Sequence, residues 1–179
     1  MNWLDLAIVG GVGGGLLYGG QRGVLRQGAL MVGFYVSLVM AARYYSQAAG
    51  FLVTHLPQAD RAIASGYMLA GLTAGGTLGL GWLSQTVYPQ GGLPRAALLD
   101  RVAGAGLGAA WSWAVVAFAL TVLLYGLSFS WGTQEPLRQQ IFAQLETSQL
   151  FGLVRTTFPG LRDLIIPWLP GGLPVPLSA

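Results

Sequence analysis

The chain of 179 residues contains no cysteine, no lysine and a single histidine, His55. Without cysteine it can form neither disulfides nor thiolate metal sites, and one imidazole cannot build a histidine metal cluster within the chain. The absence of lysine excludes a phosphate-loop lysine and a Schiff-base lysine. All nine basic residues are arginines, scattered singly, so the net charge of +3 indicates membrane orientation rather than nucleic-acid binding.

Charged residues are also scarce. They make up 8% of the chain, against 54% hydrophobic residues, and the mean hydropathy is +0.59. Soluble domains carry charge on roughly a quarter of their residues, so this composition predicts an integral membrane protein. The N-terminus has Asp5 where a secretory signal carries basic residues, and glycines in place of a compact leucine core. A cleaved signal peptide is therefore not expected.

The apolar runs predict an all-α membrane protein with four transmembrane helices, at about 3–20, 24–42, 62–85 and 102–131. These spans form a membrane domain over residues 1–131. Residues 132–179 are expected to hold an amphipathic helix over 134–157 along the membrane surface, followed by a Pro-rich tail without a long helix. Residues 44–58 are amphipathic, and the sequence leaves open whether they form an interfacial helix or a re-entrant loop.

Small residues recur at four-residue spacing in the spans. The fourth span carries Gly104 and Gly108 as a GxxxG pair, and residues 102–131 contain no Asp, Glu, Lys, Arg or His. Such a strip lets the backbone of another helix approach closely inside a bilayer. The third span is only moderately hydrophobic and has two consecutive GxxxG steps, so we expect it at the centre of the bundle, against the first or fourth span. Its glycines are Gly71, Gly75 and Gly79.

Charged residues mark the ends of the spans. Asn2 and Asp5 are placed to cap the first helix. Arg22 and Gly23, with Arg26 close behind, form the first turn, and Asp100 with Arg101 opens the fourth helix. In one interpretation the arginines anchor the protein at the cytoplasmic surface and Asp100 is an N-cap or dipole partner. In the other, Asp100 pairs with Arg22 or Arg26 and locks the two hairpins together.

The arginine distribution predicts the orientation. With four spans, the first and third loops share one side, where the net charge is 4 − 1 = +3 from Arg22, Arg26, Arg95 and Arg101 against Asp100. The other side has a net charge of 5 − 5 = 0. Because basic residues favour the cytoplasmic side, we expect both termini outside the cytoplasm.

Catalytic motifs are missing from the sequence. The run 10–15 fails the GxGxxG fingerprint, because Leu16 or Tyr18 stands where the last glycine is required. No Gly-x-Ser-Gly motif accompanies His55 to suggest an intramembrane serine protease. All six carboxylates lie at or beyond the ends of the predicted helices, and none lies in mid-membrane as a proton relay would. We therefore predict no enzyme activity, no cofactor and no metal.

Taken together, the motifs resemble the CvpA family, the colicin V production proteins of bacterial inner membranes. They occur in the order Asn2-Trp3-Leu4-Asp5, Arg22-Gly23 with Arg26, Gly33, and Leu99-Asp100-Arg101 with Gly104 and Gly108, over roughly residues 2–131. Gln27 departs from the family, which commonly has an acidic residue there. The resemblance implies a small multi-span protein linked to toxin production or export and to envelope homeostasis. In some relatives a similar unit precedes a periplasmic serine protease, which agrees with an outward C-terminus.

Two classes of function follow. The first is a non-enzymatic membrane scaffold whose partners are the lipid bilayer, further copies of itself, and export or envelope proteins, with no nucleic acid. The alternative is an oligomeric channel or small-solute transporter, whose polar lining would have to come from a few hydroxyls such as Thr73 and Thr77. A weaker third possibility is a cofactor-free subunit of a larger membrane complex.

Overall fold

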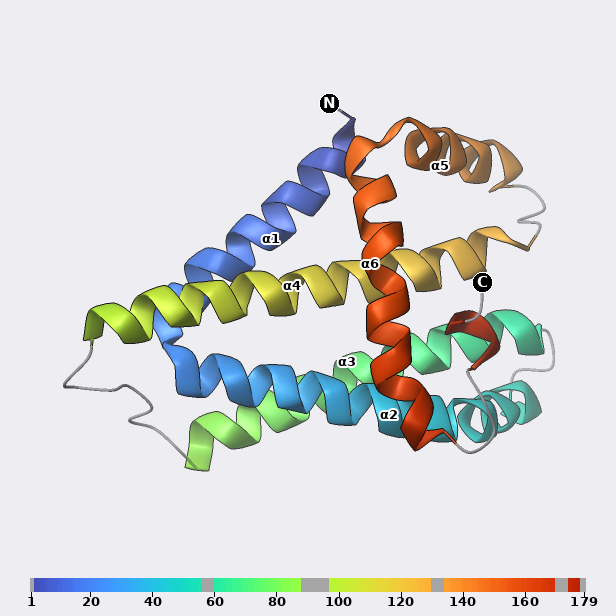
Figure 1. The fold of residues 1–179 in the computed structure, drawn as a ribbon. Helices are drawn as coiled ribbons and strands as arrows, with labels where there is room; N and C mark the ends of the chain where they lie inside the picture. The colour runs from blue at the N-terminus through green and yellow to red at the C-terminus, as the bar shows by residue number, and fades with distance from the viewer. Residues whose placement is uncertain (1, 56–59, 88–96, 130–133, 170–173, 178–179) are drawn as a thin grey trace.

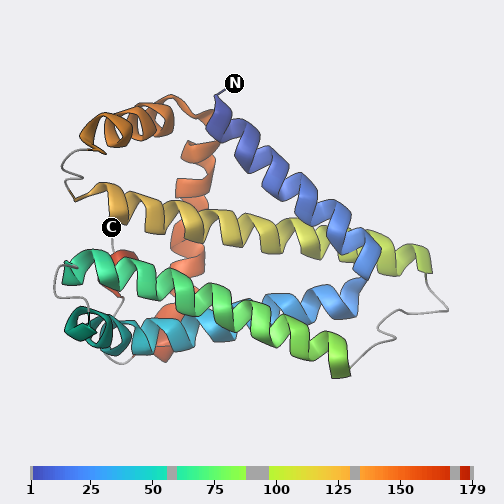
Figure 2. The same cartoon turned by 180° about the vertical axis from the view of Figure 1, so that it is seen from behind.

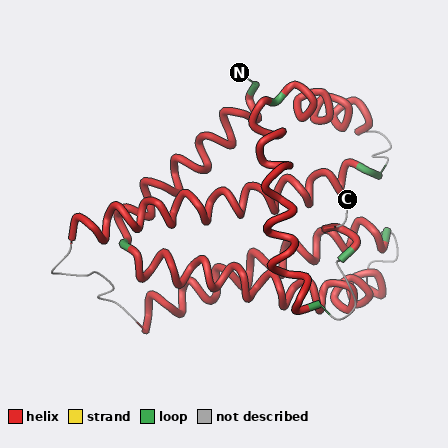
Figure 3. The backbone as a smooth tube through the Cα atoms, in the orientation of Figure 1, coloured by secondary structure: helices red, strands yellow, loops and turns green. Residues whose placement is uncertain are grey.

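The computed structural model describes residues 2–55, 60–87, 97–129, 134–169 and 174–177, and they form an all-helical structure (Figures 1 and 3). This confirms the predicted all-α fold, while the predicted four spans stay a prediction. The helices are α1 (Trp3–Arg22), α2 (Val24–His55), α3 (Arg61–Val87), α4 (Ala97–Leu127), α5 (Glu135–Thr147) and α6 (Gln149–Ile165), followed by the 3₁₀ turns η2 (Ile166–Trp168) and η3 (Val175–Leu177). Of these, α2 and α4 are long and apolar enough to cross a membrane.

The helices are arranged as two antiparallel pairs. The helix α1 packs along α4, and α3 packs along α2, while contacts between α2 and α4 join the pairs. The helix α6 runs across both α4 and α2, as seen from either side in Figures 1 and 2. The helix α4 therefore contributes to both parts of the core. Phe118 of α4 meets Phe34 of α2 edge to face at 6.0 Å, and Ala117 of α4 packs with Leu4 of α1 and Val154 of α6.

The second helix does not end at the expected boundary near residue 42. It continues through His55, so residues 44–55 are helical and do not form a re-entrant loop, while residues 56–59 lie outside the described part of the chain. The helix buries Ala41 and Ala42 at the expected boundary and Ala49 within the extension. Because alanine is the strongest helix former, these residues allow the helix to continue while small side chains pack against the core.

The expectation that the third span lies centrally, against the first or fourth, is wrong. The helix α3 packs chiefly on α2, and the glycines facing α2 are not those of the GxxxG steps. A Cβ at Gly76 would lie 2.6 Å from Ser37 Oγ, and one at Gly81 would lie 2.7 Å from Leu30 Cδ2. The side chains of α2 thus pack against the face of α3 that carries Gly76 and Gly81, and not against the predicted face of the GxxxG steps.

The C-terminal region also differs from the prediction. The single amphipathic helix expected over 134–157 is broken at Ser148, which caps α6 by accepting a hydrogen bond from the Phe151 N–H at 3.0 Å. The helix α6 then runs through Pro159 to Ile165, so the expectation of no long helix in the tail is wrong. Proline removes one backbone donor, and packing across α4 and α2 holds the rest of the helix.

The helix α5 is joined to the C-terminal end of α4 by an arginine. Arg138 Nη1 donates to the Leu127 carbonyl at 2.8 Å, and Arg138 also forms an ion pair with Glu135. The hydrogen bond to the Glu135 carboxylate raises the pKa of Arg138 above its usual value. A cation at the last carbonyls of α4 complements the negative end of that helix dipole.

Candidate functional site

Glycines bring the backbones of α1 and α4 into close contact. A Cβ added at Gly15 would lie 2.7 Å from the Gly108 carbonyl oxygen, and one at Gly108 would lie 2.9 Å from Gly19 Cα. A Cβ at Gly104 would lie 2.9 Å from Gly23 Cα. These neighbouring atoms belong to the backbone, which cannot rotate away. The predicted GxxxG strip of α4 is therefore a packing face, and its partner is the glycine series of α1.

Beside this contact, Asp100 joins the two hairpins. Its side chain is buried, and its Oδ1 accepts a hydrogen bond from the Val24 N–H, the first donor of α2, at 2.9 Å. Gly23 has a φ of +79°, and a Cβ there would lie 2.9 Å from Asp100 Cγ. The left-handed backbone and the close carboxylate both favour glycine at this position. Asp100 thus caps α2 from the first turn of α4.

The structure links Asp100 to the first hairpin, whereas the anchoring role of the arginines and the pairing of Asp100 with Arg22 or Arg26 stay predictions. Asp100 does lock the hairpins, but through a backbone amide at a helix N-terminus, which stabilises negative charge. The guanidinium of Arg22 lies over the ring of Tyr18, with Cζ 4.1 Å from its centroid. Arg26 is half-buried on the first turn of α2, and Arg101 is exposed at the start of α4. The turn gathers these charges at one end of the bundle.

Gln27 lies next to this cluster and is completely buried. Among the described residues, neither its amide nitrogen nor its amide oxygen has a hydrogen-bond partner, while its backbone N–H donates to the Gly23 carbonyl at 3.2 Å. A carboxylate here would need a cationic partner, because burying an isolated charge is far more costly than burying a neutral amide. The departure from the family's acidic residue therefore leaves the core neutral at this position.

At the opposite end of α1, Asp5 forms a second junction. It belongs to the predicted cap of α1, in which Asn2 and Asp5 bond reciprocally. Its Oδ1 also accepts from Ser148 Oγ at 2.6 Å and from the Leu150 N–H at 3.2 Å, where α6 begins. One buried carboxylate thus caps α1 and holds the start of α6. Sequence reasoning missed Ser148, whose only local signal is its position as a helix N-cap.

The third group of predicted residues faces away from the rest of the described chain. Gly71, Gly75 and Gly79 are exposed, and a Cβ at any of them would meet no atom within 4 Å. Nothing in the described part of the chain covers this face of α3. The same kind of strip that brings α1 and α4 together is thus presented outward on α3.

A groove of about 520 Å³ separates α1 from α3 on the side where both are rich in glycine. Gly11 and Gly14 of α1 face Gly81 of α3 across it, and Arg22 and Gln85 also line it. Its walls are mainly apolar. Within the described ranges, no three His, Asp or Glu side chains come together as a metal site. The arrangement is suited to packing against apolar groups.

Comparison with known proteins gives one match. The sequence model of the family described as Colicin V production protein matches residues 4–158, which includes α1 to α5 and most of α6. The match extends beyond the region 2–131 that carried the resemblance. Neither the comparison with curated proteins nor that with solved structures gives a match. Because the family model covers most of the chain, including both junctions described above, the chain belongs to the colicin V production protein family.

Proposed function

We propose that this chain is a non-enzymatic scaffold of the bacterial inner membrane that acts in toxin production or export and in envelope homeostasis. In this proposal it crosses the bilayer four times with both termini outside the cytoplasm, and it associates with further copies of itself or with export and envelope proteins. Family membership and the two membrane-competent helices support the membrane setting. The observation that carries the scaffold role is the uncovered glycine face of α3.

The argument rests on the contrast between two glycine strips. On α4, Gly104 and Gly108 are covered by α1 and the turn that follows it, whereas on α3 the GxxxG residues face outward: Gly71, Gly75 and Gly79. In a bilayer, apolar burial does not drive helix association, so close backbone approach and packing supply the contact energy. A glycine face left open on α3 therefore suits a helix from another chain.

Self-association through α3 is testable with Gly75→Cys in the otherwise cysteine-free chain. Oxidation of the protein in native membranes should give a disulfide-linked dimer, because a two-fold contact brings the same residue of both copies together. Gly10→Cys is the matched control, since Gly10 is also exposed with open space around it. Equal crosslinking of the two variants would contradict a specific α3 contact.

The alternative, a channel or small-solute transporter, needs hydroxyls along a water path. Thr73 and Thr77 are buried and donate to carbonyls of their own helix, at 2.7 Å to Leu69 and 2.6 Å to Thr73. This placement favours the scaffold. Cysteines at these two positions should remain unlabelled by aqueous thiol reagents, whereas labelling from water would support the channel.

The proposed orientation is tested with paired reporters fused after Ala179, one active only in the periplasm and one only in the cytoplasm. We expect signal from the periplasmic reporter. A cytoplasmic signal would mean that the span count is wrong or the bundle is inverted, and periplasmic partners for the tail would then be excluded.

A further inference from the structure

The exposed surface of α4 changes character halfway along the helix. After Arg101, the exposed residues of its first half are all apolar or glycine: Val102, Ala103, Gly106 and Ala110. Within residues 111–127, all of which the structure describes, only Ala119 is exposed. One half of an apolar helix thus faces outward like a lipid-facing surface, and the other is enclosed by protein.

The exposed surface of α2 also changes along the helix. Its exposed residues up to position 40 are all apolar: Leu25, Ala29, Met31, Val32, Val36 and Met40. From position 43 onward they are mostly polar: Arg43, Tyr44, Ser46, Gln47, Phe51, Thr54 and His55. The helix therefore leaves an apolar environment near Arg43, well before its end.

The helix α3, which runs the other way, shows the same division in reverse order. Over residues 61–70, all described, only Arg61 and Tyr67 are exposed. From Gly71 to Leu83 the exposed residues are apolar or glycine, and polar side chains return only at Gln85. Because Gly76 of α3 faces Ser37 of α2 and the two helices are antiparallel, their changes near Arg43 and Ala70 lie at one level. The change in α4 comes earlier, since Phe118 is already beside Phe34.

The distance between charged residues matches a bilayer. On α2, Arg26 and Arg43 are 43 − 26 = 17 residues apart, and on α1, Asp5 and Arg22 are 22 − 5 = 17 residues apart. At about 1.5 Å per residue each interval is about 25 Å. A hydrocarbon core is about 30 Å thick, and arginine side chains at the ends of a span reach outward to the interface. The whole of α4, with 31 residues, is about 46 Å long, far more than one crossing needs.

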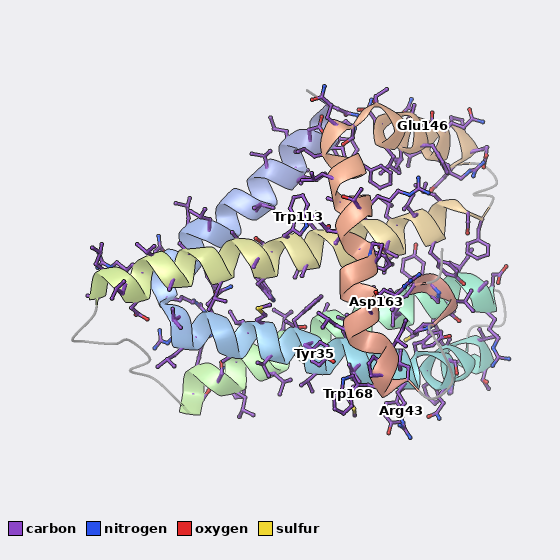
Figure 4. All side chains as sticks on the ribbon, in the orientation of Figure 1. Tyr35, Arg43, Trp113, Glu146, Asp163 and Trp168 are labelled. Atoms are coloured by element: carbon purple, nitrogen blue, oxygen red, sulfur yellow. The ribbon has the colours of Figure 1, made fainter. Side chains whose placement is uncertain are left out.

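The helix α6 crosses the bundle at this boundary. Trp113 Nε1 of α4 donates to Thr157 Oγ1 at 3.0 Å, and Tyr35 Oη of α2 donates to the Leu164 carbonyl at 2.8 Å. Figure 4 shows Tyr35, Arg43, Asp163 and Trp168 near the lower end of α6. The start of α6 is held by Asp5 of α1. The helix α6 therefore contacts α1, α2 and α4.

The surface of α6 combines features of a helix lying in a membrane interface. Val154 faces the core and is buried. Leu153 and Leu164 are exposed beside the exposed arginines Arg155 and Arg162. Apolar side chains that enter the acyl region, together with cations that meet phosphate groups, are typical of in-plane helices.

Exposed aromatic residues are found at both edges of the apolar region. Trp3 is 57% exposed at the Asp5 end of α1, and Trp168 is 61% exposed just after α6. Tyr18 and Trp82 are exposed near the arginine turn. Tryptophan and tyrosine concentrate at the two membrane–water interfaces. The two edges match the charged levels derived above.

From these observations we propose that α6 is bound to the headgroup layer of one membrane surface and that the bilayer ends there. The bilayer then contains only the half of the bundle between the arginine turn and α6. The second half of α4, with α5, η3 and the adjoining parts of α2 and α3, forms a helical cap outside it. This inference rests on the proposed insertion of the chain into the membrane, and it adds the position at which the bilayer ends. The fourth span is then shorter than the expected 102–131.

The partner of α6 in this proposal is an anionic lipid surface. Arg155 has Arg162 seven residues later, which places the two guanidinium groups on the same face after two helical turns. Asp163, at 3.4 Å from Arg162 Nε, offsets one of the positive charges. Phosphate groups of lipids supply the complementary charge.

Two single cysteines on α4 decide the position of the bilayer. Gly106 and Ala119 are both small and exposed, and the chain has no native cysteine. A span over 102–131 puts Ala119 near the bilayer centre and Gly106 near its edge. Our proposal puts Gly106 in hydrocarbon and Ala119 at the aqueous boundary. In membranes, a charged maleimide should label Ala119→Cys at least about tenfold faster than Gly106→Cys, because thiolate forms only where water reaches it.

Ser46→Cys serves as the water-exposed reference. The proposed boundary would be overturned if both cysteines were labelled slowly and at equal rates. It would also be overturned if Gly106→Cys were labelled faster than Ala119→Cys. Labelling of Gly106→Cys as fast as Ser46→Cys would show that the helices are not inserted, which overturns the proposed function together with this inference.

The position of α6 is tested separately in vesicles containing anionic phospholipid. Thr156 is exposed on α6, so a fluorophore on Thr156→Cys reports the depth of this helix. Lipids with a nitroxide at the headgroup should quench it more strongly than lipids with a nitroxide in mid-chain. Stronger mid-chain quenching, or no quenching by either lipid, would overturn the assignment of α6 to the headgroup layer.

Discussion

A methyl group added at Gly19 should push α1 away from α4. The Cβ of Gly19→Ala would lie 2.9 Å from Gly108 Cα, and it would come closer still to the Gly104 carbonyl oxygen. Non-bonded carbon atoms are comfortable at about 3.5–4.0 Å, so the two backbones must separate by roughly 1 Å. Overpacking a close contact of this kind costs about 1–3 kcal/mol.

Gly10→Ala is the matched control, because a Cβ at Gly10 meets nothing within 4 Å. Both variants gain the helix propensity of alanine over glycine, about 1 kcal/mol in water. The difference between their stabilities therefore isolates the steric cost. We expect Gly19→Ala to be less stable than Gly10→Ala by about 1–3 kcal/mol, a factor of about 5 or more in the population of the closed contact.

A disulfide across the same contact provides the assay. A Cβ at Gly20 would lie 3.5 Å from Ala105 Cβ, within the range of about 3.5–4.5 Å found in disulfides. The double variant Gly20→Cys/Ala105→Cys should crosslink rapidly in membranes under mild oxidation. Adding Gly19→Ala should slow the crosslinking, whereas adding Gly10→Ala should not. If Gly19→Ala leaves both the crosslinking rate and the stability unchanged, the close contact between α1 and α4 is refuted.

Two further predictions concern the buried carboxylates. Asp100→Ala removes the acceptor of the Val24 N–H, so it should lower the free energy of unfolding in mild detergent by about 1–2 kcal/mol. Asp100→Asn keeps an acceptor oxygen and should lose less stability. Equal losses in the two variants would contradict the capping role. Ser148→Ala removes the hydroxyl that caps α6 and donates a hydrogen bond to Asp5. Amide hydrogen exchange in the first turn of α6 should therefore accelerate by about tenfold. The exchange rates of α3 should not change and serve as the internal control. Unchanged exchange in the first turn of α6 would mean that other contacts hold α6.

Some features of the site were predictable because they depend on residues close together in the chain. The capping of α1 by Asn2 and Asp5 involves one helical turn, and the structure has it as expected. The strip of Gly104 and Gly108 was identified as a packing face from spacing alone, since residues four apart share a helix face. Gly23 lies between two helices and has a positive φ, which glycine adopts readily. The sequence did not show which side chain packs against this turn.

Other features depend on which surfaces meet, and sequence reasoning failed there. The glycine steps of α3 resemble those of α4, yet only the latter are covered, because α2 presents Ser37 and Leu30 to Gly76 and Gly81 instead. Spacing marks a face as able to pack but does not identify its partner. In the same way, the length of the apolar run in α4 did not show that α5 and α6 enclose its second half.

The sequence by itself determined that this chain is helical, apolar, poor in charge and a member of its family, since helix periodicity, composition and motifs are local properties. Only the tertiary structure decided that Asp100 caps α2 and that Asp5 holds the start of α6. Those contacts join residues 76 and 143 positions apart in the chain. A hydrogen bond between such distant residues depends on how whole helices pack, and packing follows from the fit of many side chains at once rather than from any single motif.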